Sequence, residues 1–179
     1  MSRRELNPEM AQEARDCVVA LRKGSMASFP SPSGWCTVCD VADESATKAL
    51  LQSEEFSHHC LLLDHDGRLV RYYGQLSEPL LNLIEFTEKP LQFILKGASQ
   101  AAKHLPGNLP FMIASDAFSN RVSSSFGKPL LAAFGEAPNE TFDNIPCHVV
   151  NLRTSMDANT DQIVVMQFNQ DGSFQFIKK

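Results

Sequence analysis

Cysteine and histidine are the residue types of this chain best suited to redox or metal chemistry, and the sequence holds five of each. The closest pair of thiols is Cys36 and Cys39, with two residues between them. Two thiols at this spacing can exchange with a disulfide when one of them has a lowered pKa. The same spacing is typical of two ligands of a tetrahedral zinc ion. The sequence therefore raises a redox hypothesis and a zinc hypothesis for the same two residues.

A zinc site needs further ligands, and two short segments, 58–60 and 147–148, contain histidine next to cysteine. The zinc hypothesis predicts a site made of Cys36, Cys39, His59 and Cys60. A third alternative is that the cysteines are separate buried thiols, because free cysteine is among the most buried residue types. The spacing alone leaves these three alternatives open.

Composition excludes several classes of function. The formal net charge is −5 and the basic residues are scattered, which gives no support for binding to nucleic acid through clustered Lys and Arg. No apolar stretch approaches the length that a membrane-spanning helix needs. The start of the sequence lacks the apolar run of a secretory signal, and an odd number of irregularly spaced cysteines argues against a disulfide framework. We therefore expect a cytoplasmic protein.

Two stretches with an Asp-Gly turn predict β-hairpins. Residues 60–73 run from an apolar segment through Asp66-Gly67 into a second segment that mixes apolar and basic residues. Residues 163–177 repeat the plan around Asp171-Gly172. Glycine tolerates the positive φ of tight hairpin turns, and aspartate favours local hydrogen bonds there. The apolar segment 60–63 has no polar face, so we expect a central, covered strand.

The remaining elements follow from periodicity and from helix-ending residues. Residues 1–24 contain a helix that Asn7 caps, and 25–35 form a loop rich in Pro and Ser with a short strand at most at its start. A second helix follows, with Asp43 or Ser45 as its cap. Residues 78–104 predict two abutting helices or one helix kinked at Pro90. Other expected elements are strands at 110–114 and 147–152, a helical turn after Asp116, and an ambiguous apolar run at 129–134.

These elements predict one α+β domain over residues 1–179. Its sheet should be mainly antiparallel, with the hairpins around 60–73 and 163–177 as its main parts and the helices packed on it. Strands that are neighbours along the chain favour this arrangement.

The segment 35–39 resembles the active-site motif of thioredoxin-like proteins. This resemblance implies that Cys36 is the nucleophile and Cys39 the resolving thiol. The succession of helix, Asp-Gly hairpin, helix and later strands also resembles the roadblock, profilin and PAS-like group of small α+β domains. That second resemblance covers residues 44–104, with later strands from 110–114 and 147–177, and implies a domain that dimerises or presents a face to a partner.

The leading hypothesis is a non-catalytic regulatory, sensor or protein-interaction domain. It binds a protein partner or associates with itself as a homodimer. The alternatives are a thiol–disulfide redox protein that uses Cys36 and Cys39, or a binding domain that zinc stabilises. We expect no cofactor under the leading hypothesis and zinc under the third. The sequence leaves a small-molecule ligand unidentified.

Overall fold

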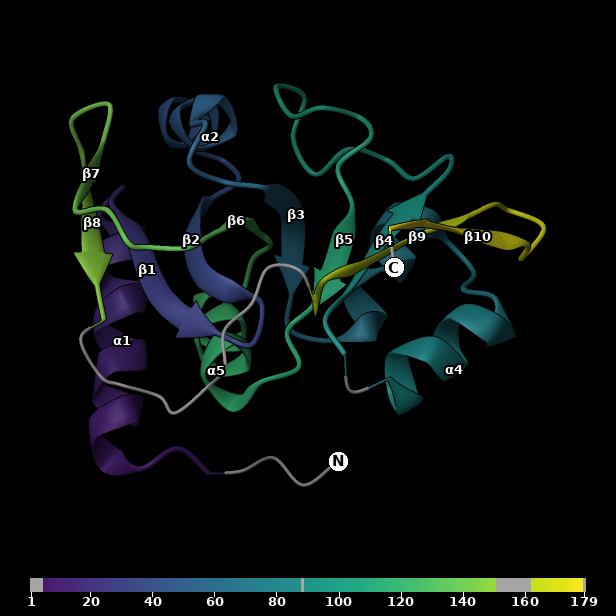
Figure 1. Ribbon diagram of the computed structural model, residues 1–179, viewed down its shortest axis with the longest axis horizontal. Coiled ribbons are helices and arrows are strands. Elements are labelled where there is room, and N and C mark those ends of the chain that lie inside the picture. Colours follow the sequence, from purple (N-terminus) through teal and green to yellow (C-terminus); the bar gives the residue numbers. More distant parts are fainter. Residues whose placement is uncertain (1–4, 88, 151–161, 179) are drawn as a thin grey trace.

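The computed structural model describes residues 5–87, 89–150 and 162–178. Its strands form one mixed sheet, with helices on both faces (Figure 1). The helices are α1 (Pro8–Arg22), α2 (Glu44–Gln52), a short 3-10 helix η1 (Asp66–Arg68), α3 (Val70–Tyr73), α4 (Glu78–Phe86) and α5 (Ala117–Phe126). The strands are β1 (Met26–Ser31), β2 (Gly34–Asp40), β3 (His58–Leu63), β4 (Leu91–Leu95), β5 (Phe111–Ile113), β6 (Leu130–Gly135), β7 (Thr141–Phe142), β8 (Ile145–Val149), β9 (Val164–Phe168) and β10 (Phe174–Lys178). None of the described helices is both long and apolar enough to cross a membrane.

The order of strands across the sheet is β10-β9-β4-β5-β3-β6-β2-β1-β8-β7. Three of the pairs between described strands are parallel: β1 with β8, β3 with β5, and β4 with β9. The prediction of an α+β fold built on a mainly antiparallel sheet with two hairpins is therefore wrong, and the architecture is of the α/β kind. The reason is that the parallel pairs join segments far apart in the sequence, which the order of elements along the chain does not reveal.

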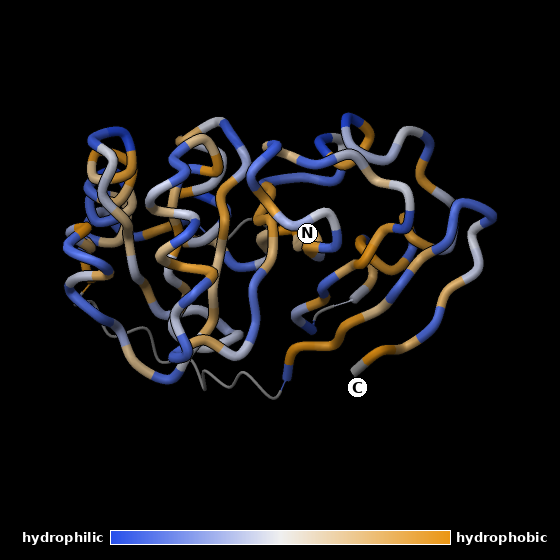
Figure 2. Tube along the Cα trace, turned by 90° about the horizontal axis from the view of Figure 1, so that it is seen from above, coloured by the Kyte–Doolittle hydropathy of each residue, from blue (hydrophilic) through white to orange (hydrophobic). Residues whose placement is uncertain are grey.

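Two apolar cores lie on the two faces of the sheet. On β3, Leu61 and Leu63 point into one core while Cys60 and Leu62 point into the other, because successive side chains of a strand alternate. Helices α2 and α4 cover the first core, and α1 and α5 cover the second. Figure 2 shows hydrophobic residues along the strands and polar residues at many of the outer turns. The expectation that 60–63 is a covered central strand is confirmed.

The hairpin predicted at 60–73 is wrong. After β3 the chain turns into η1 and α3 instead of returning as a strand, and the Leu69 N–H donates to the Asp66 carbonyl at 2.8 Å. Leu69 is fully buried, so this helical turn places an apolar residue in the core. The Arg68 guanidinium binds both the Asp64 carboxylate and the Gly127 carbonyl. The burial of Leu69 and the contact of Arg68 with the distant Gly127 outweigh the local hairpin preference of the Asp-Gly turn.

The hairpin predicted at 163–177 is confirmed, since β9 and β10 pair antiparallel through a turn with Gly172 at φ +85°.

The helical prediction for 78–104 is right only in its first part, because α4 ends at Phe86 and the chain then forms β4. Pro90 separates the two elements, and β4 lies in the sheet between β9 and β5. An apolar run of five residues cannot be assigned to helix or strand by periodicity alone.

The predicted N-terminal helix and its Asn7 cap are confirmed, as the Asn7 side chain accepts from the Met10 N–H at 2.8 Å. Asp43 caps α2 and Asp116 caps α5 in the same way.

The loop predicted at 25–35 is wrong over most of its length, because β1 runs to Ser31 and β2 begins at Gly34. Pro30 is tolerated within β1, and the buried Ser28 and Thr37 hydroxyls bond each other at 3.1 Å.

Candidate ligand-binding pocket

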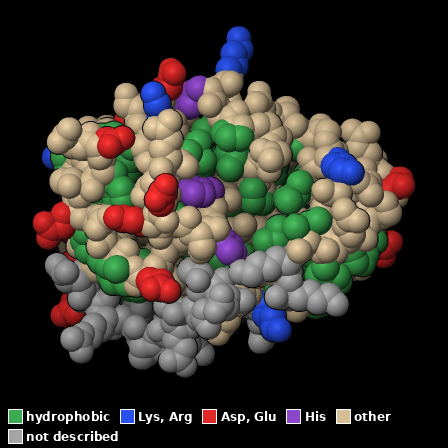
Figure 3. Space-filling model, turned by 45° about the horizontal axis from the view of Figure 1, so that its top comes forward, with side chains coloured by type: hydrophobic (Ala, Val, Ile, Leu, Met, Phe, Trp, Pro, Cys, Tyr) green, Lys and Arg blue, Asp and Glu red, His purple; other side chains and the backbone are tan. Residues whose placement is uncertain are grey.

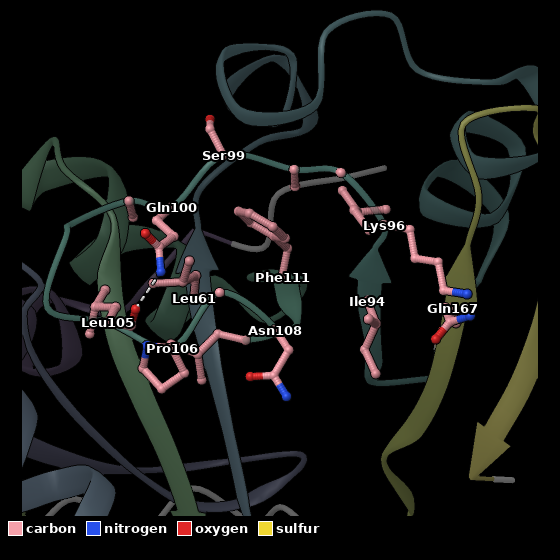
Figure 4. Close-up of a pocket in the computed structure, with 16 residues that line it drawn as sticks. Leu61, Ile94, Lys96, Ser99, Gln100, Leu105, Pro106, Asn108, Phe111 and Gln167 are labelled. Carbon is pink, nitrogen blue, oxygen red and sulfur yellow. Dashed lines mark hydrogen bonds between the residues drawn. The ribbon is translucent and has the colours of Figure 1, made fainter.

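A cavity of about 290 Å³ lies where β4 and β5 diverge. These two strands share a single paired position, Phe93 with Phe111, so the sheet opens beyond it. The chain from 96 to 110 leaves the end of β4, passes over the opening and returns to β5 (Figure 4). The cavity is lined by Leu61, Ile94, Leu95, Lys96, Gly97, Ala98, Ser99, Gln100, Ala101, Leu105, Pro106, Gly107, Asn108, Leu109, Phe111 and Gln167.

Hydrogen bonds hold the covering segment in place at its start and within it. The Lys96 N–H donates to the Phe168 carbonyl at 3.0 Å, and the Ser99 N–H donates to the Tyr72 carbonyl at 2.8 Å. Farther along, the Gln100 side-chain amide donates to the Leu105 carbonyl at 2.7 Å. The segment is therefore tied to β9, to α3 and to itself. This supports a preformed cavity.

The cavity has an apolar middle and a polar end. The Phe111 ring lies between the two sides of the opening, and Ile94 lies on the side formed by β4 (Figure 4). Lys96 and Gln167 lie together at that side, whereas Gln100 and Leu105 lie across from them. Such a combination of apolar walls and a few polar groups is typical of small-molecule sites.

Lys96 is the sole titratable side chain among the described residues that line the cavity. No hydrogen bond or ion pair within the described part of the chain uses the side chains of Lys96, Asn108 or Gln167. One ammonium group with two amides nearby can bind an anionic group of a ligand. The described lining provides no second titratable side chain with which Lys96 could exchange a proton.

Cys36 and Cys39, predicted to act together, lie on β2 and point into different cores. Cys36 belongs to the core under α1 and α5, and Cys39 to the core under α2 and α4. Residues three apart on a strand face opposite sides, so the sheet separates the two thiols. Burial raises the pKa of both thiols, which opposes formation of the reactive thiolate.

His59 and Cys60 also point to opposite sides of the sheet. The His59 Nε2 atom lies 2.9 Å from the Leu50 carbonyl, and burial lowers the pKa of this imidazole while that bond partly opposes the shift. Cys60 is fully buried beside Met112, and its pKa is raised by burial. The structure thus does not bring the four predicted zinc ligands together.

Other candidate ligands are dispersed as well. His148 lies 3.3 Å from the Glu13 carboxylate, and Cys147 is buried close to the end of β1. In the described ranges no group of three or more His, Cys, Asp or Glu side chains is placed to hold a metal ion. Neither the redox nor the zinc hypothesis gains a supporting contact here, and both stay predictions.

The sequence did not indicate the pocket residues, because the periodicity of 91–104 predicts a helix there. Gly97, with φ +85°, and the Pro106-Gly107 pair could have indicated a turn and an irregular segment after a short strand. The contribution of Gln167 had no local signal, since it comes from the parallel pairing of β4 with β9.

The sequence matches no protein-family profile and no curated protein. Solved structures do share its fold. Full-length HypF, in a phosphate- and nucleotide-bound form, gives a TM-score of 0.69 at 16% identity over 92% of this chain. YciO of E. coli gives 0.69 at 17% identity over 97% of this chain and 91% of its own. Sua5 of P. abyssi, complexed with L-threonine, gives 0.63 at 12% identity over 88% of this chain.

This chain spans 28% of the HypF chain and 51% of the Sua5 chain. At these identities the likeness shows the fold alone. It overturns both resemblances drawn from the sequence, to the roadblock, profilin and PAS-like domains and to thioredoxin-like proteins. The WCTVC motif lies inside a buried sheet strand, and the Asp-Gly turn after β3 does not form a hairpin.

Proposed function

We propose that this chain is a non-catalytic binding domain that holds a small molecule with an apolar body and one anionic group. The proposal rests on the pocket between β4 and β5, which has apolar walls and Lys96 as the single charged group of its described lining. Binding of this kind would serve a sensor or regulatory role. A volume of about 290 Å³ lies at the small end of the range for ligand pockets, so the ligand is of amino-acid size.

The solved relatives in fold support this ligand chemistry. One is bound to phosphate and nucleotide and another to L-threonine, and each of these molecules carries an anionic group. The face drawn in Figure 3 gives little sign of a nucleic-acid partner. On the face drawn in Figure 3 the Lys and Arg side chains are isolated, while hydrophobic side chains and histidines occupy the middle.

The proposal is tested by thermal unfolding and calorimetric titration with four probes: L-threonine, phenylacetate, AMP and inorganic phosphate. A ligand that binds the native state raises the melting temperature. We expect L-threonine or phenylacetate to do so, and inorganic phosphate, which has no apolar body, to have no effect. Mass spectrometry of the recovered ligand should show it unchanged. Chemical conversion of the bound probe would contradict the non-catalytic assignment.

Two variants connect binding to this pocket. Lys96→Gln should weaken binding about ten-fold or more, since a hydrogen bond to a charged group contributes about 1.5–3 kcal/mol. Its control is Lys128→Gln, at an exposed lysine outside the pocket. Ile94→Trp should abolish binding by filling the cavity, whereas Ile145→Trp, on β8, should not. Failure of both L-threonine and phenylacetate to bind, or unchanged binding in both pocket variants, would show the proposal to be wrong.

A further inference from the structure

The last strand at one end of the sheet carries large, exposed apolar side chains. Among the described strands β10 pairs with β9 alone, at one end of the sheet (Figure 1). Phe174, Phe176 and Ile177 are 47%, 50% and 53% exposed, respectively. Edge strands usually carry charges or other features that prevent pairing with another chain. The centre of β10 is instead uncharged and aromatic, which favours an interaction surface.

The backbone of Phe174 is oriented for pairing across this edge. The Asn169 N–H donates to the Ser173 carbonyl at 2.9 Å, so these two residues form a hydrogen-bonded position of the β9–β10 ladder. Hydrogen-bonded and non-bonded positions alternate in an antiparallel ladder. Phe174, opposite Phe168, is then at a non-bonded position, and its N–H and C=O point away from β9.

The sequence of the strand is complementary to itself. Phe174-Gln175-Phe176 reads the same in both directions, so an antiparallel strand centred on Gln175 opposes each Phe174 to Phe176 of a second copy. The two rings lie on the face of Phe168, where they would form cross-strand aromatic pairs. Gln175 lies on the other face, and two such amides can bond each other across a two-fold axis.

We propose that a second copy of this chain pairs antiparallel with β10, around a two-fold axis at Gln175. The sheet then continues from one copy into the other. The register with β9 shifts between Phe176 and Lys178, which keeps the regular edge short. A short edge gives a weak dimer whose population depends on concentration.

A charge-swap pair tests this geometry by sedimentation velocity over a concentration series. Gln175→Lys and Gln175→Glu each place two like charges together at the axis, and each should weaken self-association about ten-fold or more. An equimolar mixture of the two variants should restore association, because the charges are then opposite. Gln175 is exposed, so both variants should keep the wild-type melting temperature. This control separates loss of the dimer from loss of the fold.

Disulfide cross-linking tests the position of the same two-fold axis independently. Residues opposite each other at a non-bonded antiparallel position have Cα atoms about 4.5 Å apart, within the range that a disulfide spans. Gln175→Cys should therefore form a covalent dimer under mild oxidation. The five native cysteines are buried, so the new thiol should dominate the reaction. Asn139→Cys, at the far end of the sheet, should stay monomeric.

Two results would overturn the proposal. One is a wild-type chain that stays monomeric at the highest concentration reached. The other is a dimer that both charged variants and their mixture form equally well, because its axis then lies elsewhere. Neither result bears on ligand binding, since the pocket residues Lys96 and Ile94 do not belong to β10.

Discussion

Gln92 is a buried polar residue in the middle of β4, and its amide contributes little to the stability of the native state. Its side chain is 2% exposed, and its amide nitrogen has no hydrogen-bond partner among the residues that the structure describes. A buried donor without a partner costs about 1–3 kcal/mol in the free energy of unfolding. Gln92→Met keeps a similar shape and removes that donor. We expect it to raise the free energy of unfolding by about 1 kcal/mol, as measured by urea denaturation.

The matched control is Gln52→Met at the exposed end of α2, which should change the same free energy by only a few tenths of a kcal/mol, roughly. A loss of stability in Gln92→Met would show that the amide makes a contact that stabilises the native state.

At the scale of elements, the turn that ends β4 determines whether the pocket forms. Gly97 has φ +85°, and a Cβ atom there would lie 2.5 Å from the Gln170 side-chain nitrogen. Gly97→Ala forces a residue with a side chain into the left-handed region beside the β9–β10 turn. We expect a loss of about 1–2 kcal/mol in the free energy of unfolding and weaker ligand binding.

Gly107→Ala is the control within the same covering segment. Its φ is not in the left-handed region, and a Cβ atom there would meet its nearest neighbour at 3.4 Å, close to ordinary contact. This variant should leave stability nearly unchanged. Equal effects of the two substitutions on chemical denaturation would contradict the assignment of strain to Gly97.

At the scale of the whole molecule, five buried thiols make stability sensitive to high pH. Burial raises the pKa of Cys147 to about 12 and raises the pKa values of Cys17, Cys36, Cys39 and Cys60 as well. An unfolded thiol has a pKa of about 8.5, so above that pH the unfolded chain loses protons that the native chain keeps. The contribution of the thiols to stability is therefore constant below about pH 8 and falls as pH rises above about 8.5.

Each thiol should contribute about 1.4 kcal/mol of this loss per pH unit, measured by urea denaturation under reducing conditions between about pH 8.5 and 10. Cys17→Ala and Cys60→Ala should each make the slope shallower by that amount, although both lower stability at neutral pH. Met112→Leu changes the core beside Cys60 without removing a thiol, so its slope should equal that of the wild type. Identical slopes for all four proteins would show that the native thiols also ionise.

Elements whose ends are marked by a capping residue or a tight turn could be predicted from the sequence alone. Asn7, Asp43 and Asp116 are side-chain caps, and each begins a helix. For the second helix the sequence left Asp43 and Ser45 as alternatives. The final hairpin was also predictable, because alternating residues around Asp171-Gly172 need no distant partner. These features depend on interactions within a few residues, which a sequence displays directly.

Contacts between distant segments decided the rest. Only the parallel pairing of β4 with β9 shows that 91–95 is a strand, and only the divergence of β4 from β5 creates the pocket around Lys96. The same cause separates Cys36 from Cys39, since β2 pairs with β6 and β1 and its two faces then lie in different cores. A local pattern records which residues are neighbours along the chain. Which face each of them occupies is set by partners far away in sequence.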